Sequence, residues 1–306
     1  MYGYSIHMKR IVTLDPATTE IVAFLDGTSR IVGVPEDADY PVEVKQKVKV
    51  TRKLVNVDNS LPSEVIDEIV RQHIKERKPL HEALWNKIYE LEPDLIVGQG
   101  ICEVCALPSI SSLDREKIVT MPKKYRISRM EVFNPSTFMD IPKETMKIAK
   151  ILGRERKAEE LKEQFEKSIE ETKGIAKGTK TVVIEWIKPI HLIGKWVSDM
   201  VNLMGSKPLA RPGGHGGIFD WEVIREFNPD YLIISPCSFS VNRSLMEIEK
   251  ITTLPGYSDL NAVKQDHVYV LEPLYARASQ RTLEFLNALK EIYTTGEVER
   301  KYGIRL

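Results

Sequence analysis

The sequence predicts an α/β protein with two α/β (Rossmann-like) lobes joined by one long helix, and three observations support that prediction. The chain has 306 residues, which is enough for two compact domains with buried cores. In both halves a helical pattern is followed by Pro-Asp and a short apolar run, at residues 94–98 and 230–235. A long helical pattern lies between the halves. We therefore expect an amino-terminal lobe over residues 1–141, a connecting helix over 142–174 and a carboxy-terminal lobe over 175–306.

The amino-terminal lobe begins with strand and helix signals in alternation. The run RIVTLDPATTEIVAF at residues 10–24 predicts a strand, a proline turn and a helix opened by two threonines. The apolar run at residues 30–34 predicts a second strand. Residues 61–92 have helical periodicity that is broken near Pro79. Residues 94–98 are apolar and bounded by breakers, which is typical of a buried parallel strand.

The segment between the lobes has the pattern of one long helix. Pro142 suits a first helical position and Gly174 suits the end. Gly153 lies where the helix would break or bend. A helix of about 30 residues would be roughly 45 Å long and would connect the lobes rigidly. One face of it is apolar at helical spacing: Ala158, Leu161, Phe165 and Ile169.

The carboxy-terminal lobe repeats the alternation of strands and helices. Residues 180–187 predict its first strand, and residues 196–204 predict a helix that ends at Gly205. The apolar run at residues 230–235 predicts a second buried strand. Residues 283–293 predict the last helix, before a charged tail.

Composition excludes several classes of function. Basic and acidic residues number 44 each, so no global charge attracts nucleic acid, and we expect no nucleic-acid partner. No apolar run reaches the length of a membrane span. The first ten residues contain no secretory signal, so we expect a cytoplasmic protein from the sequence as written, or an extracytoplasmic one if a leader is missing from it. We expect a monomer.

Enzyme motifs are absent from the sequence. It contains no Gly-x-Ser-x-Gly elbow, no phosphate-binding loop and no His-Glu-x-x-His. We therefore expect a protein that is not an enzyme, with no catalytic residues and no catalytic cofactor.

The three cysteines leave their role open. Cys102 and Cys105 form a Cys-x-x-Cys just after the strand at 94–98, where ligands of open α/β sheets bind, and Cys237 is alone. The pair could be redox-active or half of a metal site, but no second pair follows at zinc-finger spacing. A structural or ligand-lining role, with Cys102 in the lining, is the favoured hypothesis.

The glycine-rich loop at residues 211–218 is unusual because His215 stands among four glycines. Glycines let a backbone approach a ligand closely, and His215 could ligate a metal centre such as cobalt or haem iron. The alternative is a mobile surface loop, and the sequence favours neither.

Several aromatic and basic side chains lie at predicted strand ends and loops. Flat aromatic faces suit a large flat ring, although any single aromatic residue is more often part of a core. Arg277 and Arg281 could meet amide or carboxylate groups of a ligand, or cap and pair on the surface. Our candidates among the aromatics are Trp186, Trp196, Phe239 and, most strongly, Tyr275.

The strings at residues 10–24 and 30–34, taken together with ARASQR at 276–281, resemble the ABC-transporter substrate-binding proteins for cobalamin, haem and iron-siderophores. The resemblance spans residues 9–295, and the stretch at 185–196 is similar to the cobalamin-binding group. It implies two lobes with the ligand in a cleft between them.

The resemblance also implies the ligand and the residues that line its site. Cobalamin or another corrinoid is the first expectation, and haem or an iron-siderophore is the second. A cytoplasmic corrinoid- or metal-handling protein that reuses the fold is the third. The resemblance supports Tyr275, Trp186, Trp196, Arg277 and Cys102 as lining residues. His215 and Phe239 complete the expected lining from their places in the sequence alone, since family members usually lack a histidine at the position of His215.

Docking to an ABC permease is a further implication of the resemblance. The family presents one glutamate on each lobe to arginines of the permease. Glu222 occupies the second-lobe position, but the first-lobe position is Asn86, with Glu82 and Glu90 one helical turn away on either side. We expect permease docking that is incomplete.

Overall fold

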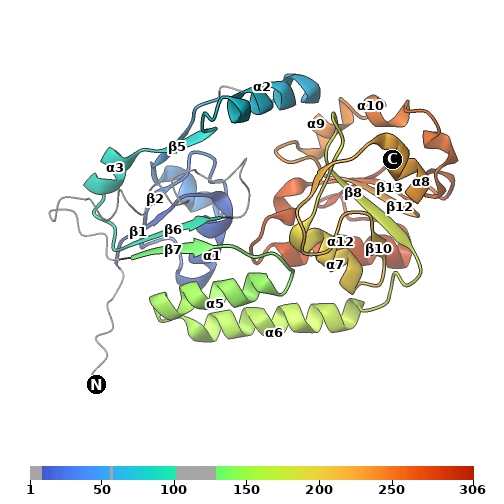
Figure 1. The fold of residues 1–306 in the computed structure, drawn as a ribbon. Coiled ribbons are helices and arrows are strands. Elements are labelled where there is room, and N and C mark those ends of the chain that lie inside the picture. Colours follow the sequence, from blue (N-terminus) through green and yellow to red (C-terminus); the bar gives the residue numbers. More distant parts are fainter. Residues whose placement is uncertain (1–8, 56–57, 101–128) are drawn as a thin grey trace. The chain divides into compact units, whose positions relative to one another are not determined.

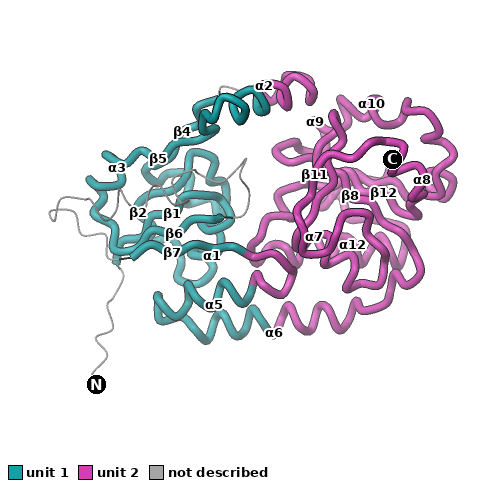
Figure 2. The backbone as a smooth tube through the Cα atoms, in the orientation of Figure 1, with its two compact units in different colours: residues 1–56, 70–134, 142–162 teal, residues 57–69, 135–141, 163–306 magenta. Residues whose placement is uncertain are grey.

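The structure is a computed structural model that describes residues 9–55, 58–100 and 129–306. The chain divides into two compact units, shown in Figure 2. Unit 1 comprises residues 1–56, 70–134 and 142–162, and unit 2 comprises residues 57–69, 135–141 and 163–306. The assignment of residues 57–69 to unit 2 was not expected from the sequence.

Unit 1 contains a five-stranded sheet in the order β3-β2-β1-β6-β7, and every neighbouring pair is parallel (Figure 1). The strands are β1 Ile11–Thr13, β2 Ile31–Val34, β3 Val48–Lys49, β6 Leu95–Gln99 and β7 Arg129–Phe133. A separate antiparallel pair is formed by β4 Thr51–Lys53 and β5 His81–Ala83. The helices are α1 Pro16–Asp26, η1 Val42–Gln46 and α3 Trp85–Glu90. The helix α2 Ser63–Lys75 begins in unit 2 and ends in unit 1.

Unit 2 contains a seven-stranded sheet in the order β11-β9-β8-β12-β13-β14, with β10 paired to β8. The strand β12 is parallel to both of its neighbours, β8 and β13, whereas β9 is antiparallel to β8. The strands are β8 Lys180–Trp186, β9 His191–Leu192, β10 Lys207–Pro208, β11 Gly217–Ile218, β12 Tyr231–Ile234, β13 Val268–Leu271 and β14 Gly303–Arg305. The helices are α7 Lys195–Leu203, α8 Trp221–Phe227, α9 Val241–Leu245, α10 Glu249–Thr252, η3 Tyr257–Asp259, α11 Asn261–Lys264, η4 Pro273–Ala276 and α12 Thr282–Thr295.

The central strands of both sheets are buried on both faces, as apolar runs without alternation predict. Ile11 and Val12 of β1 and Leu95, Ile96 and Val97 of β6 have no exposed surface. In unit 2, three successive residues of β12 are equally buried: Leu232, Ile233 and Ile234. The prediction of two α/β lobes is confirmed.

The segment between the lobes is helical but interrupted. The helix α5 Asp140–Leu152 ends before Gly153, which has φ +66°, a left-handed conformation that favours glycine. The helix α6 Glu155–Thr172 follows, and the chain passes from unit 1 to unit 2 within it, after Lys162. The expected connecting helix is therefore divided into α5 and α6, because Gly153 ends α5. In the part of the chain that the structure describes, no helix has both the length and the apolar character needed to span a membrane.

Candidate functional site

Three of the predicted aromatic residues follow parallel strands of unit 2 at the same edge. The strands β8, β12 and β13 are parallel neighbours, so their carboxyl ends meet at one edge of the sheet. Trp186 is the last residue of β8, Phe239 lies in the loop after β12, and Tyr275 lies in η4 after β13. Ligands of open α/β sheets bind beyond the carboxyl ends of strands, so this edge is the candidate site in unit 2.

Trp186 and Phe239 form an aromatic pair at this edge. Their ring centroids are 4.9 Å apart with the planes at 45°. Phe239 has no exposed surface, whereas Trp186 is half-buried. The guanidinium of Arg243 lies over the Phe239 ring, 4.2 Å from its centroid. Phe239 therefore packs against Trp186 as a fully buried partner, and only Trp186 of the pair has exposed surface.

Trp196 and Tyr275 belong to a second aromatic group. The indole Nε1 of Trp196, near the start of α7, donates to the carbonyl of Ala276 at 2.7 Å. This bond ties α7 to η4. The Tyr275 ring meets Tyr302 edge-on, with 5.4 Å between centroids, and the guanidinium of Arg281 lies 5.0 Å from the Tyr275 centroid. Both Trp196 and Tyr275 are half-buried, so each keeps part of its surface exposed to solvent.

Arg277 follows η4 and is half-buried. Its carbonyl accepts the backbone N–H of Ser279 at 2.8 Å and the hydroxyl of Thr282 at the start of α12. The main chain of Arg277 thus closes the turn between η4 and α12, two residues after Tyr275 in the chain.

His215 lies in a loop that is held by backbone hydrogen bonds. The N–H of Lys195 donates to the carbonyl of Gly214 at 2.6 Å, and the N–H of Gly213 donates to the carbonyl of Lys195 at 3.2 Å. A side-chain carbon at Gly194 would lie 2.4 Å from the Gly214 oxygen, so only glycine permits this approach. His215 itself is exposed.

The described residues include no group of three or more histidine, cysteine, aspartate or glutamate side chains that could hold a metal ion. A metal centre at His215 would therefore have to bring most of its own ligands, as the iron of haem and the cobalt of a corrin do. Cys102 and Cys105 lie outside the described residues.

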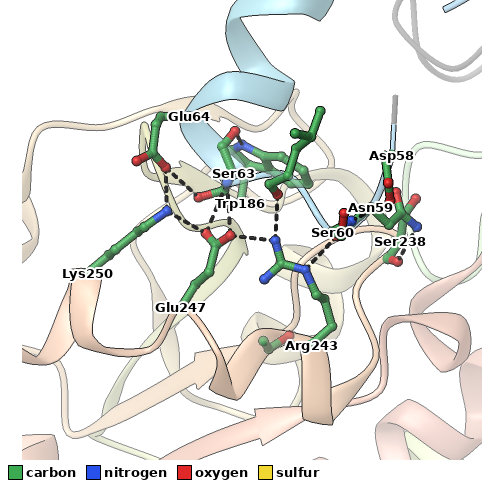
Figure 3. Close-up of polar contacts among 12 residues, drawn as sticks. Asp58, Asn59, Ser60, Ser63, Glu64, Trp186, Ser238, Arg243, Glu247 and Lys250 are labelled. Atoms are coloured by element: carbon green, nitrogen blue, oxygen red, sulfur yellow. Dashed lines mark hydrogen bonds and ion pairs between the residues drawn. The ribbon is translucent and has the colours of Figure 1, made fainter. Parts of the chain in front are cut away.

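Residues 58–67, which we call the strap, cover part of the same edge (Figure 3). The indole Nε1 of Trp186 donates to the carbonyl of Ser63 at 3.2 Å. Glu247 accepts the N–H of Ser63 through both carboxylate oxygens, at 3.0 and 3.1 Å. Arg243 and Lys250 each form an ion pair with Glu247. The predicted ligand-facing Trp186 is thus engaged by the protein's own chain.

Glu247 is the most strongly perturbed acid of this group. Burial raises the pKa of Glu247, but hydrogen bonds from Ser63, Arg243 and Lys250 outweigh that effect and lower it to about 2. The sequence analysis missed Arg243, Glu247 and Lys250. Their spacing of four and three residues in RSLMEIEK would put them on one face of a continuous helix, although Glu247 lies in the turn between α9 and α10, and it does not identify the segment that they bind.

In unit 1, Asp15 follows β1 at the carboxyl edge of that sheet. Its carboxylate caps α1, accepting the N–H of Thr18 at 2.9 Å and the Thr18 hydroxyl at 2.7 Å. It also accepts the N–H of Gln99 at the end of β6, at 2.8 Å. Burial raises the pKa of Asp15 to about 6 although these three bonds favour the carboxylate. The sequence analysis placed a turn here but no role for Asp15.

Asn86 and Glu222 occupy matching places in the two units. Each is the second residue of a short helix that begins with tryptophan, α3 in unit 1 and α8 in unit 2, and each is exposed. The Glu222 carboxylate pairs with Arg225 on the same helix, and hydrogen bonding to Arg225 lowers the pKa of Glu222. The unit 2 helix therefore presents a carboxylate that is already paired with an arginine of its own chain.

Comparison with known proteins gives one family and one fold. The sequence model described as "periplasmic binding protein" matches residues 11–275. The chain is 25% identical over 293 residues to an uncharacterized ABC transporter substrate-binding lipoprotein of Bacillus subtilis, covering 92% of this chain and 79% of the relative.

Among solved structures, the chain is similar to a periplasmic vitamin B12 binding protein of Vibrio cholerae, with a TM-score of 0.66, 16% identity, and coverage of 94% of this chain and 98% of the other. It is also similar to a periplasmic heme binding protein of Pseudomonas aeruginosa, with a TM-score of 0.68, 16% identity and 98% coverage of both chains. At these identities the likeness shows the fold, which is that of two α/β lobes.

Proposed function

Since the chain belongs to the periplasmic binding protein family, we propose that it is the substrate-binding component of an ABC importer and that its ligand is a corrinoid, cobalamin first. Members of this family bind and do not catalyse, so the protein is not an enzyme. No covalent chemistry is needed of any residue described above.

One observation carries the choice of a large flat ligand. Trp186 ends β8 and Tyr275 follows β13 at one edge of the unit 2 sheet, Trp196 is hydrogen-bonded to η4 near Tyr275, and all three residues are half-buried. Exposed aromatic faces contribute large contact areas to the binding of flat ring systems. The similarity of residues 185–196 to the cobalamin-binding group supports a corrinoid over other ring systems, and these residues run from the end of β8 to the start of α7.

A second candidate ligand is haem. His215 is exposed on a loop fixed to the start of α7, where its imidazole could ligate an iron that already carries four ring nitrogens. The likeness to the heme binding protein of Pseudomonas aeruginosa is as close as that to the vitamin B12 binding protein. Iron-siderophores remain a third class, without a side chain here that favours them.

The first experiment is a ligand panel. Purified protein is titrated with cobalamin, haemin and a ferric siderophore, and absorbance, binding heat and melting temperature are measured. A ligand at about a hundred times its dissociation constant stabilises the native state by about 2.7 kcal/mol. We expect a one-to-one complex with cobalamin. A panel in which no corrinoid gives heat or a melting shift contradicts the corrinoid proposal.

A variant pair locates the ligand. Replacing Tyr275→Ala should weaken cobalamin binding by about 1–3 kcal/mol, because one large aromatic contact is lost. Tyr275→Phe retains the ring and is the matched control, with binding close to that of the original protein. If haemin binds instead, His215→Ala should change its Soret band, and an unchanged band removes His215 as the iron ligand.

A further inference from the structure

The strap is bound in large part through its main chain. Arg243 donates from Nε to the carbonyl of Asn59 and from a terminal nitrogen to the carbonyl of Leu61, both at 2.6 Å. Glu247 accepts the N–H of Ser63, and Trp186 donates to the Ser63 carbonyl. Three unit 2 side chains thus bind main-chain groups of the strap between Asn59 and Ser63 (Figure 3).

Two contacts involve side chains of the strap, an ion pair at Glu64 and a contact between a histidine and Asp67 that is an ion pair only when the histidine is protonated. Lys250 pairs with Glu64 and also with Glu247. At the far end, Nε2 of His191 lies 3.4 Å from the buried carboxylate of Asp67. The contacts therefore extend along the strap from Asn59 to Asp67.

Hydrophobic burial contributes little to this attachment. Within the strap, Ile66 is the only apolar residue in the buried class, while Val65 is exposed and Leu61 is half-buried. Asp58, Asn59 and Ser60 are exposed as well. Segments with few buried apolar contacts and mostly polar attachments open locally at a free energy below that of global unfolding.

The strap also contacts the carboxyl edge of the unit 2 sheet, which is the proposed ligand-binding surface. It engages the indole N–H of Trp186 and reaches the loop after β12, where Nδ2 of Asn59 lies 3.4 Å from the carbonyl of Ser238. Both contacts are at the carboxyl edge of the unit 2 sheet, where we place the ligand.

We propose that the strap is a displaceable cover of this edge, which opens as one segment when Arg243 and Glu247 release its main chain, and that opening frees Trp186 for the ligand. The opening itself does not depend on the identity of the ligand. Its effect on binding rests on the proposed function.

The first test measures opening by hydrogen exchange in the full chain without ligand. We compare the original protein with Glu247→Gln and with Glu249→Gln, a matched control on an exposed residue of α10 that makes none of these contacts. Because a hydrogen bond to a charged partner is lost, exchange over residues 58–67 should rise about tenfold or more in Glu247→Gln. Exchange in β12 and β13 should not change, and the control should match the original protein.

Two outcomes of that test overturn the proposal. In one, strap exchange is the same in all three proteins, so Glu247 does not hold the strap. In the other, exchange rises throughout unit 2 in Glu247→Gln, so that the residue stabilises the unit as a whole and the strap does not open separately.

The second test measures access. Association of cobalamin and of haemin is followed by stopped-flow absorbance in the same three proteins, and the ligand that binds should associate several-fold faster with Glu247→Gln. If hydrogen exchange shows that the strap of Glu247→Gln is open and the ligand still associates no faster, the proposal that the strap covers the site is wrong. If neither ligand binds any of the three, the proposed function fails, and the exchange data alone decide whether the strap opens.

Discussion

Two buried carboxylates are stabilised in opposite ways. Glu247 accepts hydrogen bonds from Ser63, Arg243 and Lys250, which outweigh the effect of burial and lower its pKa to about 2. Asp15 accepts three hydrogen bonds, but all its donors are neutral, and burial raises its pKa to about 6. The balance between burial and the hydrogen bonds that favour the carboxylate therefore decides the direction of each pKa shift.

This difference predicts the pH dependence of unfolding at Asp15. The pKa of Asp15 is about 6 in the folded protein, above the ordinary aspartate value of 3.8, so the folded state binds the proton more tightly. The contribution of Asp15 to stability is greatest below the lower value and is lost as pH rises through about 6. The loss is on the order of 2–3 kcal/mol, at 1.36 kcal/mol per unit.

Asp15→Asn removes this titration, so the difference in unfolding free energy between the original protein and the variant should fall as pH rises from 4 to 6.5. Urea unfolding at several pH values measures it. Glu247 titrates between about 4.5 and 2, below most of this window. A difference that stays constant from pH 4 to 6.5 would show that Asp15 is already ionised throughout.

At the scale of elements, the loop at 211–218 and the helix α7 depend on one close approach. Gly194 is buried where its missing side chain would meet the Gly214 carbonyl and the Gly216 nitrogen, each 2.4 Å away. These are backbone atoms, which cannot rotate aside as a side chain would. The position of His215 therefore follows from a glycine twenty-one residues earlier in the chain.

Gly194→Ala should consequently destabilise the protein by about 1–3 kcal/mol, the usual cost of overpacking a filled site. Gly217→Ala is the control, because its added carbon would meet nothing within 4 Å, and a change within about 0.5 kcal/mol is expected. Urea unfolding of the two variants measures both effects. Equal stability of Gly194→Ala and the original protein would mean that the loop is free to move away from α7.

The accuracy of the sequence-based predictions varies with the range of the contacts involved. The runs at residues 94–98 and 230–235 were predicted as strands, and β6 and β12 form there, because burial on both faces leaves an unbroken apolar run. The short strand β5 was missed within the helical pattern at 61–92, since three partly buried residues with polar members produce no periodic signal.

The strap could not be predicted for a different reason. Ser63 and Glu247 are 184 residues apart in the chain, and their contact joins a backbone N–H to a carboxylate. A backbone donor has no sequence signature. For the aromatic residues, the sequence identified Trp186, Trp196 and Tyr275 at strand ends and loops. It did not separate them from the fully buried Phe239, because the burial of Phe239 depends on the loop after β12.

At the scale of the whole molecule, the two units repeat one plan. In each, a short helix begins with tryptophan, a polar residue follows, and Pro-Asp leads into a buried strand: Trp85 and Asn86 before β6, and Trp221 and Glu222 before β12. The repetition supports the equivalence of Asn86 and Glu222 that was expected from the resemblance. It also shows an asymmetry, since one unit presents a carboxylate and the other an amide.

That asymmetry predicts weak docking to a permease. Two arginines of a permease would meet one carboxylate, and Glu222 is already paired with Arg225. Charge-assisted pairs need both partners, so we expect weak or absent binding to a cobalamin permease in nanodiscs. Asn86→Glu should strengthen binding by about 0.2–1 kcal/mol if the new pair stays exposed, and by more if it is desolvated.

The control for that prediction is Asn86→Gln, which changes the length of the side chain but adds no charge. Titration of the three proteins against the permease at low and at physiological salt should separate them, because exposed ion pairs weaken as salt rises. The gain from Asn86→Glu should shrink at the higher salt, whereas Asn86→Gln should bind like the original protein at both. Tight binding of the unmodified protein that is lost in Glu222→Gln, and that Asn86→Glu does not improve, would contradict this prediction. Glu222 would then suffice for docking, and the amide of Asn86 would not weaken binding to the permease.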